Sequence, residues 1–251
     1  MIDESDAHTE MPDLKGRRAI VTGGTTGIGR AIALLLASEG VKVFICGRTP
    51  EHLDDALQRL GEVGDGDGIN VDLSIEEDVD RFFEAAIAFL GGIDIAVINA
   101  AVPAAALADT GKSEARFQIE TDFGAYLICA QEAARRMEGG SDMIFIGSMS
   151  AVSQQPGSSI YVASKAGIQG FVPAFRKELA EDDIKVGLIE PGFTGADFQY
   201  PEFPPEKQKE LISADKMLRA EDIAVAAHFM LTQPRRSAVS LIRVETRLEH
   251  P

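Results

Sequence analysis

Three residues in one stretch of the chain, Ser148, Tyr161 and Lys165, have the side chains that a proton-transfer site requires. Tyr161 precedes Lys165 by four residues, so in a helix the two side chains lie on the same face. A tyrosine, with an ordinary pKa of about 10, is a poor base at neutral pH, but a nearby ammonium group favours the phenolate and lowers that pKa. A serine hydroxyl can stabilise an oxygen on which negative charge develops. In an isolated fragment these residues would be an ordinary helix with a half-buried tyrosine and a solvated lysine, so the rest of the chain must decide.

A glycine-rich turn near the N-terminus indicates a cofactor. The segment TGGTTGIG lies between an apolar run and a stretch of helical periodicity. Glycines there allow a tight turn and a close approach of the backbone to a pyrophosphate, which the N-terminus of the following helix stabilises. Glycine at such a turn can also serve packing alone, but the position after the first strand favours dinucleotide binding. The residues expected to take part are Gly23, Thr25, Thr26, Gly27, Ile28 and Gly29.

The end of the second apolar run distinguishes between two cofactors. In NAD-binding folds an acidic residue at this point accepts hydrogen bonds from the ribose 2′-hydroxyl. This chain has ICGRTP instead, with Arg48 and Thr49. A guanidinium can bind a 2′-phosphate through charge-assisted hydrogen bonds, whereas a carboxylate would repel it. The sequence therefore predicts NADP(H), the alternative being that Arg48 is a solvated surface charge.

The elements that would position these residues alternate along the chain. Short runs rich in Val and Ile are separated by longer segments of helical periodicity. Such a pattern predicts an α/β fold: a doubly wound, Rossmann-type, mainly parallel sheet of seven strands with helices on both faces. In such sheets ligands bind beyond the carboxyl ends of the strands. Strands are expected at 17–23, 41–46, 68–72, 93–99, 142–148, 184–190 and 238–244, and helices at 28–38, 50–60, 76–90, 113–138, 159–181 and 220–232.

A single domain is expected over residues 15–251, after an acidic, flexible tail at 1–14. A segment rich in proline and aromatic residues, 193–217, interrupts the alternation, and such a long insertion is typical of a lid over a substrate pocket. Its Phe198, Tyr200 and Phe203 indicate a partly apolar substrate, or else contacts with the core or a neighbouring subunit.

The composition argues against several other classes. With 251 residues and a formal net charge of −16, the chain is not expected to bind nucleic acid or an anionic membrane. Its apolar runs contain polar residues or proline, and no signal-peptide pattern is present, so we expect no membrane span and a cytoplasmic location. Cys46 and Cys129 are far apart and the four histidines are scattered, so neither a metal site nor a Ser-His-Asp hydrolase is expected.

The motifs together resemble the short-chain dehydrogenase/reductase family. The resemblance runs from about Lys15 to Val244 and rests on the TGGTTGIG turn, VDL at 71–73, INAA at 98–101, Ser148, YVASK at 161–165 and PGFT at 191–194, in the family's order. It implies that Tyr161 is the general acid in carbonyl reduction and the general base in the reverse oxidation. Lys165 would lower the tyrosine pKa and hold the nicotinamide ribose, and Ser148 would hydrogen-bond the substrate oxygen.

The resemblance also implies further contacts with the cofactor. Asp72 would touch the adenine ring with Leu73 beside it, and this contact is compatible with a capping role for Asp72 at a helix that begins near Ile75. The nicotinamide carboxamide would be held by the PGFT segment, which could also be a simple turn. A homo-oligomer, tetramer or dimer, would form through the helices at 113–138 and 159–181. The cofactor residues implied here are Asp72, Leu73, Asn99, Ala100, Tyr161, Lys165, Pro191, Gly192 and Thr194.

Three positions depart from the family pattern. Ala101 replaces the usual glycine of Asn-Ala-Gly, and Ala196 replaces a threonine. Thr121 stands where the family has an asparagine, three residues before Gly124, that holds a water next to the catalytic lysine. Thr121 is therefore a candidate catalytic residue, which could bind that water through its hydroxyl. Because neighbouring helix residues point about 100° apart, we expect that Thr121 and the adjoining Asp122 do not both face the site.

The leading hypothesis is an NADP(H)-dependent oxidoreductase that interconverts a carbonyl and an alcohol by hydride transfer, with Tyr161 as general acid or base. The alternative is a catalytically weak NADP(H)-binding sensor or scaffold, suggested by the missing asparagine. A third hypothesis is cofactor-assisted epimerisation or dehydration. The complete set of Ser148, Tyr161 and Lys165 favours the enzyme.

Overall fold

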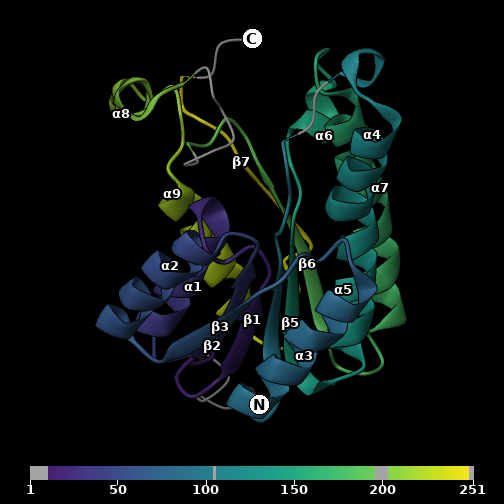
Figure 1. Cartoon of the computed structure of the whole chain (residues 1–251). Helices are drawn as coiled ribbons and strands as arrows, with labels where there is room; N and C mark the ends of the chain where they lie inside the picture. The colour runs from purple at the N-terminus through teal and green to yellow at the C-terminus, as the bar shows by residue number, and fades with distance from the viewer. Residues whose placement is uncertain (1–10, 104–105, 196–202, 249–251) are drawn as a thin grey trace, which may run out of the picture.

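A β-sheet of seven strands forms the centre of the protein (Figure 1). The computed structural model describes residues 11–103, 106–195 and 203–248. All strands are parallel and lie in the order β3-β2-β1-β4-β5-β6-β7. The order reverses between β1 and β4, and in such sheets this is where a ligand crevice opens, at the carboxyl ends. The strands are β1 (Arg18–Val21), β2 (Lys42–Gly47), β3 (Gly66–Asn70), β4 (Ile93–Ile98), β5 (Met137–Ile146), β6 (Lys185–Pro191) and β7 (Leu241–Val244).

Helices cover both faces of the sheet, as Figure 1 shows. One face is covered by α1 (Gly27–Ser38), α2 (Pro50–Val63) and α9 (Ala220–Leu231). The other is covered by α3 (Glu76–Leu90), α4 (Lys112–Ile119), α5 (Ala125–Ala134) and α7 (Ser159–Glu178). The predicted doubly wound α/β fold is confirmed, and every strand predicted from the sequence is present.

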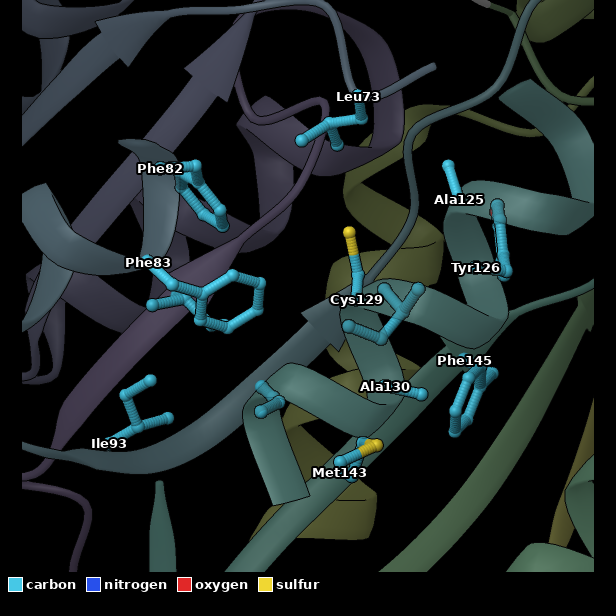
Figure 2. Packing of buried hydrophobic residues seen from close by; sticks show 14 of the residues in the cluster. Leu73, Phe82, Phe83, Ile93, Ala125, Tyr126, Cys129, Ala130, Met143 and Phe145 are labelled. Atoms are coloured by element: carbon cyan, nitrogen blue, oxygen red, sulfur yellow. The ribbon is translucent and has the colours of Figure 1, made fainter. Parts of the chain in front are cut away.

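The hydrophobic core consists of two clusters, one on each face of the sheet. Ala19 and Val21 of β1 belong to the cluster with α1, whereas Ile20 between them belongs to the cluster with α3 and α5. Because both sets of side chains are buried, the strand is apolar throughout rather than alternating. In the α3 cluster, Figure 2 shows Phe82 and Phe83 close together, and their rings meet edge to face with centroids 5.2 Å apart. Full burial of one such side chain contributes about 1.5–3 kcal/mol to folding.

The predicted helix 113–138 is wrong in one respect that bears on the site. It is divided into α4 and α5 by a π-helical segment, η3 (Glu120–Gly124), and it ends at Ala134, where the chain turns into β5. A π-helical turn closes through i→i+5 hydrogen bonds, so it shifts the phase of all residues that follow. The structure also has short helices that the periodicity did not predict, η2 (Leu107–Asp109), α6 (Ser150–Ser153) and α8 (Pro205–Ser213).

The segment predicted as a lid, 193–217, is described in part. Phe198, Tyr200 and Ala196 lie outside the described residues. The rings of Phe193 and Phe203 meet edge to face, with their centroids 5.4 Å apart. Thr194 pairs with Leu218 in an isolated parallel β-bridge. In Figure 1, α8 of this segment lies at the same end of the molecule as α6, which follows the carboxyl end of β5. The segment is therefore at the end of the sheet where a ligand would bind.

Three features of the described residues bear on predictions made from the sequence: the start of the packed chain, membrane-spanning helices and metal ligands. Leu14 is 2% exposed and packs into the α1 cluster, so the packed chain begins before Lys15. None of the helices described is long and apolar enough to cross a membrane. Among the described residues, no group of three His, Cys, Asp or Glu side chains could hold a metal ion.

At the opposite end of the sheet, where the parallel strands begin, a buried carboxylate of β5 contacts β6 and the segments that precede β1 and β7. The side chain of Asp142 is 6% exposed and lies 2.8 Å from Arg17, 3.3 Å from Lys185 and 3.1 Å from Arg235. Arg235 also contacts the exposed carboxylate of Asp183. Three cations around one buried carboxylate compensate its charge, so the loss of the carboxylate would leave these cations without their partner, far from the ligand end.

Candidate active site

A cavity of about 360 Å³ opens at the carboxyl ends of the strands near the switch point between β1 and β4. It has two ends: one between the glycine turn and Arg48, the other around Ser148, Tyr161 and Lys165. Every site residue predicted from the sequence lines this cavity, with the exception of Gly29. These residues are Gly23, Thr25, Thr26, Gly27, Ile28, Arg48, Thr49, Asp72, Leu73, Asn99, Ala100, Thr121, Ser148, Tyr161, Lys165, Pro191, Gly192 and Thr194.

The glycine turn is held tightly against β4. Gly23 has a φ of +63°, which L side chains rarely adopt. A Cβ on Gly29 would lie 2.2 Å from the carbonyl oxygen of Gly23, so Gly29 acts through packing rather than as a lining residue. The side-chain amide of Asn99 donates to the carbonyl oxygens of Thr22 at 3.0 Å and Gly23 at 3.2 Å. Asn99 thereby fixes the turn and the end of β4 relative to each other.

The first turn of α1 fits a bound pyrophosphate. The side chain of its N-cap residue, Thr26, accepts no hydrogen bond from the N–H groups of the first turn among the described residues. The N–H groups of the first helical turn have no partner inside the helix, and the positive end of the helix dipole adds to their attraction for an anion. Since Gly27 and Ile28 line the cavity, these donors open directly onto it.

The Arg48 end of the cavity is basic and exposed. The Arg48 guanidinium lies 5.3 Å from the centroid of the Phe117 ring of α4. His52, in the first turn of α2, lines the same rim. His52 was not predicted as a site residue, because the scattered histidines were weighed only as metal ligands or catalytic bases. The signal was its position in the helix that begins two residues after Arg48.

Asp72 lies beside this rim at the end of the third strand. Its Oδ1 accepts hydrogen bonds from the backbone N–H of Ser74 at 3.0 Å and from the Ser74 hydroxyl at 2.8 Å. The N-cap of α3 is Ile75, so the capping role that was predicted to accompany the adenine contact is wrong. Asp72 instead forms a short turn that shapes the wall of the cavity.

Lys165 is the centre of the inner end of the cavity. It is 2% exposed, and its Nζ donates to the hydroxyl of Tyr126 at 2.8 Å and to the carbonyl oxygen of Ile146 at 3.0 Å. Burial lowers the pKa of the lysine to about 8, and the negative charge of Asp122 opposes this shift. The ammonium lies 5.5 Å from the centroid of the Tyr161 ring, the distance expected from their one-turn spacing on α7. A positive charge is thus held next to the tyrosine, as the sequence predicted.

Tyr126 is a second tyrosine at this site, and it was not among the site residues predicted from the sequence. Its hydroxyl lies 3.0 Å from the carbonyl oxygens of both Asn99 and Ile146, where it can donate, and it accepts from Lys165. Burial, with the charges of Tyr161 and Asp122, raises the pKa of Tyr126 well above its ordinary value. Tyr126 therefore remains a neutral hydroxyl that positions Lys165, and no local motif marked it in the sequence.

Ser148 and Thr194 also line the cavity. The Oγ of Ser148, which is 9% exposed, accepts the backbone N–H of Ser150 at 3.1 Å. This bond occupies an acceptor site and leaves the hydroxyl proton available to donate into the cavity. The hydroxyl of Thr194 donates to the carbonyl oxygen of Gly192 at 3.0 Å, so Thr194 stabilises the turn of the PGFT segment.

Thr121 and Asp122 have different surroundings. Thr121 is 4% exposed and lines the cavity, whereas Asp122 is fully buried and is not among the lining residues, although the charge of Lys165 acts on it. This agrees with the expectation that the two do not both face the site, but both belong to the π-helical segment η3 and not to the regular α-helix that was predicted. Burial raises the pKa of Asp122 to about 6, and Lys165, the Val102 N–H and Arg48 oppose that rise.

The fold and the cavity are those of a Rossmann-type nucleotide-binding protein. The family described as short chain dehydrogenase matches residues 17–207. An uncharacterized oxidoreductase of Staphylococcus aureus (strain USA300) is 33% identical over 241 residues, which cover 93% of this chain and 99% of that protein. Carbonyl reductase family member 4 of Danio rerio is 32% identical, over 87% of this chain and 92% of that protein.

A solved structure extends the similarity to three dimensions. The short chain dehydrogenase of Burkholderia cenocepacia J2315 in complex with NADP superimposes with a TM-score of 0.84 at 26% identity, over 93% of this chain and 98% of that chain. The chain belongs to the short-chain dehydrogenase/reductase family, whose members are oxidoreductases that use nicotinamide cofactors. The resemblance stated from the sequence motifs is therefore confirmed.

Proposed function

We propose that this protein is an NADP(H)-dependent oxidoreductase that interconverts a carbonyl compound and its alcohol. The observation that carries the proposal is the buried Lys165 ammonium beside the Tyr161 ring at the inner end of the cavity. The similarity to a carbonyl reductase and to an NADP-bound dehydrogenase supports the same reaction class. Arg48 at the outer end supports NADP(H) over NAD(H), since a guanidinium suits a 2′-phosphate.

The residues that would hold the cofactor follow from the lining of the cavity. The N-terminus of α1 would bind the pyrophosphate, Arg48 and Thr49 the 2′-phosphate, and Asp72 with Leu73 the adenine. Pro191, Gly192 and Thr194 would border the nicotinamide. When bound there, NADP(H) supplies or accepts the hydride.

The proton chemistry belongs to the chain's own residues. In reduction, the Ser148 hydroxyl donates a hydrogen bond to the substrate oxygen, and the Tyr161 O–H gives its proton to that oxygen. The Lys165 ammonium stabilises the resulting phenolate by its positive charge. In oxidation the phenolate of Tyr161 takes the proton back from the alcohol. Tyr126 and the Ile146 carbonyl hold Lys165 in place for both directions.

Oxidation of NADPH measured against a panel of aldehydes and ketones, with the reverse reaction measured on alcohols, tests the proposal. We expect turnover that drops by a factor of about 100 to 10,000 in Tyr161→Phe, because general acid catalysis is lost while the ring is kept. NADPH binding, measured by fluorescence, should be retained in this variant. Unchanged turnover in Tyr161→Phe would overturn the assignment of the proton donor.

The same panel tests the alternative of a sensor or scaffold. The replacement of an asparagine by Thr121 near Lys165 is the observation that favours it. This alternative requires tight NADPH binding by the wild-type protein without turnover of any carbonyl or alcohol. Product formed without a net change in NADPH would instead indicate epimerisation or dehydration.

We also propose a homo-oligomer, either tetramer or dimer, formed through the helices α4, α5 and α7. Ile119 at the end of α4 is 48% exposed and Ile128 on α5 is 42% exposed, which supports a covered face there. Light scattering coupled to size-exclusion chromatography should give a mass above that of one 26.9 kDa chain. Ile128→Glu should shift the protein toward the monomer, and a monomeric wild-type protein would refute the proposal.

A further inference from the structure

Glu190, near the end of β6, is a carboxylate that is fully buried behind the cavity. Its side chain is 0% exposed, and it is not one of the residues that line the cavity. Burial of a charge is costly unless donors compensate it. Replacement of a buried ion pair by apolar side chains of similar volume is often neutral or stabilising, so stability alone does not account for a carboxylate at this position.

Two side chains from different elements hold the Glu190 carboxylate. Gln169 of α7 donates through its Nε2 to Oε1 at 2.8 Å. Arg243 of the edge strand β7 donates through its Nε to Oε2 at 2.8 Å, and Arg243 is the register partner of Glu190 in the sheet. The carboxylate therefore joins a helix, its own strand and the neighbouring strand at one point.

The bond to Gln169 ties the sheet to the helix that carries the proton-transfer residues. Gln169 follows Lys165 by four residues and Tyr161 by eight, so all three lie near one face of α7. Lys165 joins this face to β5 through the carbonyl oxygen of Ile146, and Gln169 joins it to β6 one turn further along. Because two contacts at different points fix both the depth and the tilt of a helix, the Gln169 bond completes the placement of α7.

The strand side of Glu190 leads to the other parts of the site. Pro191 and Gly192, the next two residues, line the cavity where the nicotinamide is proposed to lie. A Cβ on Gly147 would lie 3.2 Å from the Cγ of Glu190, so the Glu190 side chain passes behind the cavity wall at this lining residue. Gly147 in turn precedes Ser148. Glu190 therefore lies where α7, the nicotinamide segment and the end of β5 meet.

We propose that Glu190 is a positioning residue that holds α7 at a fixed depth against β6 through Gln169, and so aligns the Tyr161 hydroxyl with the nicotinamide segment. This inference rests on the proposed function, because the alignment matters for a reaction in which proton and hydride reach one substrate. Glu190 acts through Gln169 and through the backbone that follows it. Arg243 keeps the second carboxylate oxygen paired.

Gln169→Leu breaks the link to α7 and leaves Glu190 paired with Arg243. Gln169 is half-buried and leucine has a similar size, so we expect this variant to fold. With a carbonyl substrate from the aldehyde and ketone panel, kcat should fall by about 10- to 100-fold while the KM for NADPH stays within about threefold, because misplacement by about 1 Å costs about 100-fold in rate. Unchanged kcat in Gln169→Leu would overturn the inference.

Gln233→Leu is the matched control. Gln233 is also half-buried, and its Nε2 donates to the carbonyl oxygen of Phe229 at 2.7 Å. Its own carbonyl oxygen accepts from Lys185, the first residue of β6, so it lies at the end of the sheet away from the cavity. The control loses the same kind of hydrogen bond, and its kcat should stay within about twofold of wild type. An equal loss of kcat in both variants would refute the positioning role.

Exchange of the two side chains tests the bond itself. Gln169→Glu alone places a second carboxylate opposite Glu190, so the two charges repel and kcat should fall at least as far as in Gln169→Leu. When Glu190→Gln is added, its amide N–H donates to the carboxylate at position 169 and its carbonyl oxygen accepts from Arg243. The double variant should recover kcat to within about threefold of wild type, since the two positions are coupled. A double variant no faster than Gln169→Glu would contradict the proposal.

Titration of the Tyr161 hydroxyl needs neither cofactor nor substrate, so it separates a failure of this inference from a failure of the proposed oxidoreductase. The chain has three tyrosines and no tryptophan, so the difference in phenolate absorbance from Tyr161→Phe isolates Tyr161. Without the link to β6, α7 no longer holds Lys165 at the depth of its acceptors, and the ammonium stabilises the phenolate less. The Tyr161 midpoint should therefore rise in Gln169→Leu, return in the double variant and stay unchanged in Gln233→Leu. Equal midpoints in wild type and Gln169→Leu would overturn the inference, whatever the activity panel shows.

Discussion

Arg48 offers a prediction whose magnitude can be worked from its surroundings. Charge-assisted hydrogen bonds to a phosphate contribute about 1.5–3 kcal/mol. To make them, the guanidinium must leave the face of the Phe117 ring, where it now lies 5.3 Å from the centroid. A cation–π contact at an exposed site is worth about 0.5–1 kcal/mol. The difference is about 1–2 kcal/mol, which corresponds to a change in affinity of about 5- to 30-fold.

We therefore expect Arg48→Ala to weaken NADPH binding by about 5- to 30-fold and to leave NADH binding within about twofold. Titration of the intrinsic NAD(P)H fluorescence measures both dissociation constants under one condition of salt. Arg59→Ala is the matched control, because Arg59 is also an exposed cation on this side of the protein but pairs with Asp55 of the same helix. Equal losses for NADPH and NADH in Arg48→Ala, or no loss for either, would refute the role given to Arg48.

Three further predictions concern the turn, the distal cluster and pH. Gly29→Ala should abolish measurable binding of both nicotinamide cofactors, since the new Cβ would lie 2.2 Å from the Gly23 carbonyl oxygen. Fluorescence titration measures this binding, and retained affinity would contradict the packing of Gly29 against Gly23. Asp142→Asn should lower the free energy of unfolding, measured in urea, by about 2 kcal/mol, because it leaves the cations around Asp142 uncompensated. The control is Asp183→Asn, which should lower it by less than about 0.5 kcal/mol because the Asp183 carboxylate is 60% exposed. The folded pKa of Lys165 lies below its ordinary value of 10.5, so between about 8 and 10.5 the unfolded chain binds more protons and stability should rise with pH from this group. Urea midpoints of wild type and Lys165→Met across that range measure this contribution, and parallel curves would contradict it.

The charge states of Lys165 and Asp122 show why some site properties could not be predicted. The spacing of Tyr161 and Lys165 places both on one face of a helix whatever the rest of the fold does. How strongly the lysine is buried, and that its N–H groups donate to Tyr126 and Ile146, depends on where α7 places Lys165 relative to α5 and β5. The two acceptors lie 39 and 19 residues from Lys165 in the chain. The pKa of Lys165 depends on this burial and on the neighbouring groups, which the sequence pattern does not give.

The sequence by itself determined the features that arise from local periodicity and local backbone chemistry. These are the alternation of apolar strands and helices, the glycine turn after β1, Arg48 after β2, and the Tyr161–Lys165 spacing. The tertiary structure alone decided that η3 is π-helical, that Thr121 lines the cavity and that Asp122 is fully buried. A π-helical turn closes through i→i+5 hydrogen bonds and shifts the phase of the residues that follow, and the residue types alone do not predict where this happens. Thr121 and Asp122 were therefore visible in the sequence as residues, but their surroundings became clear only in the folded chain.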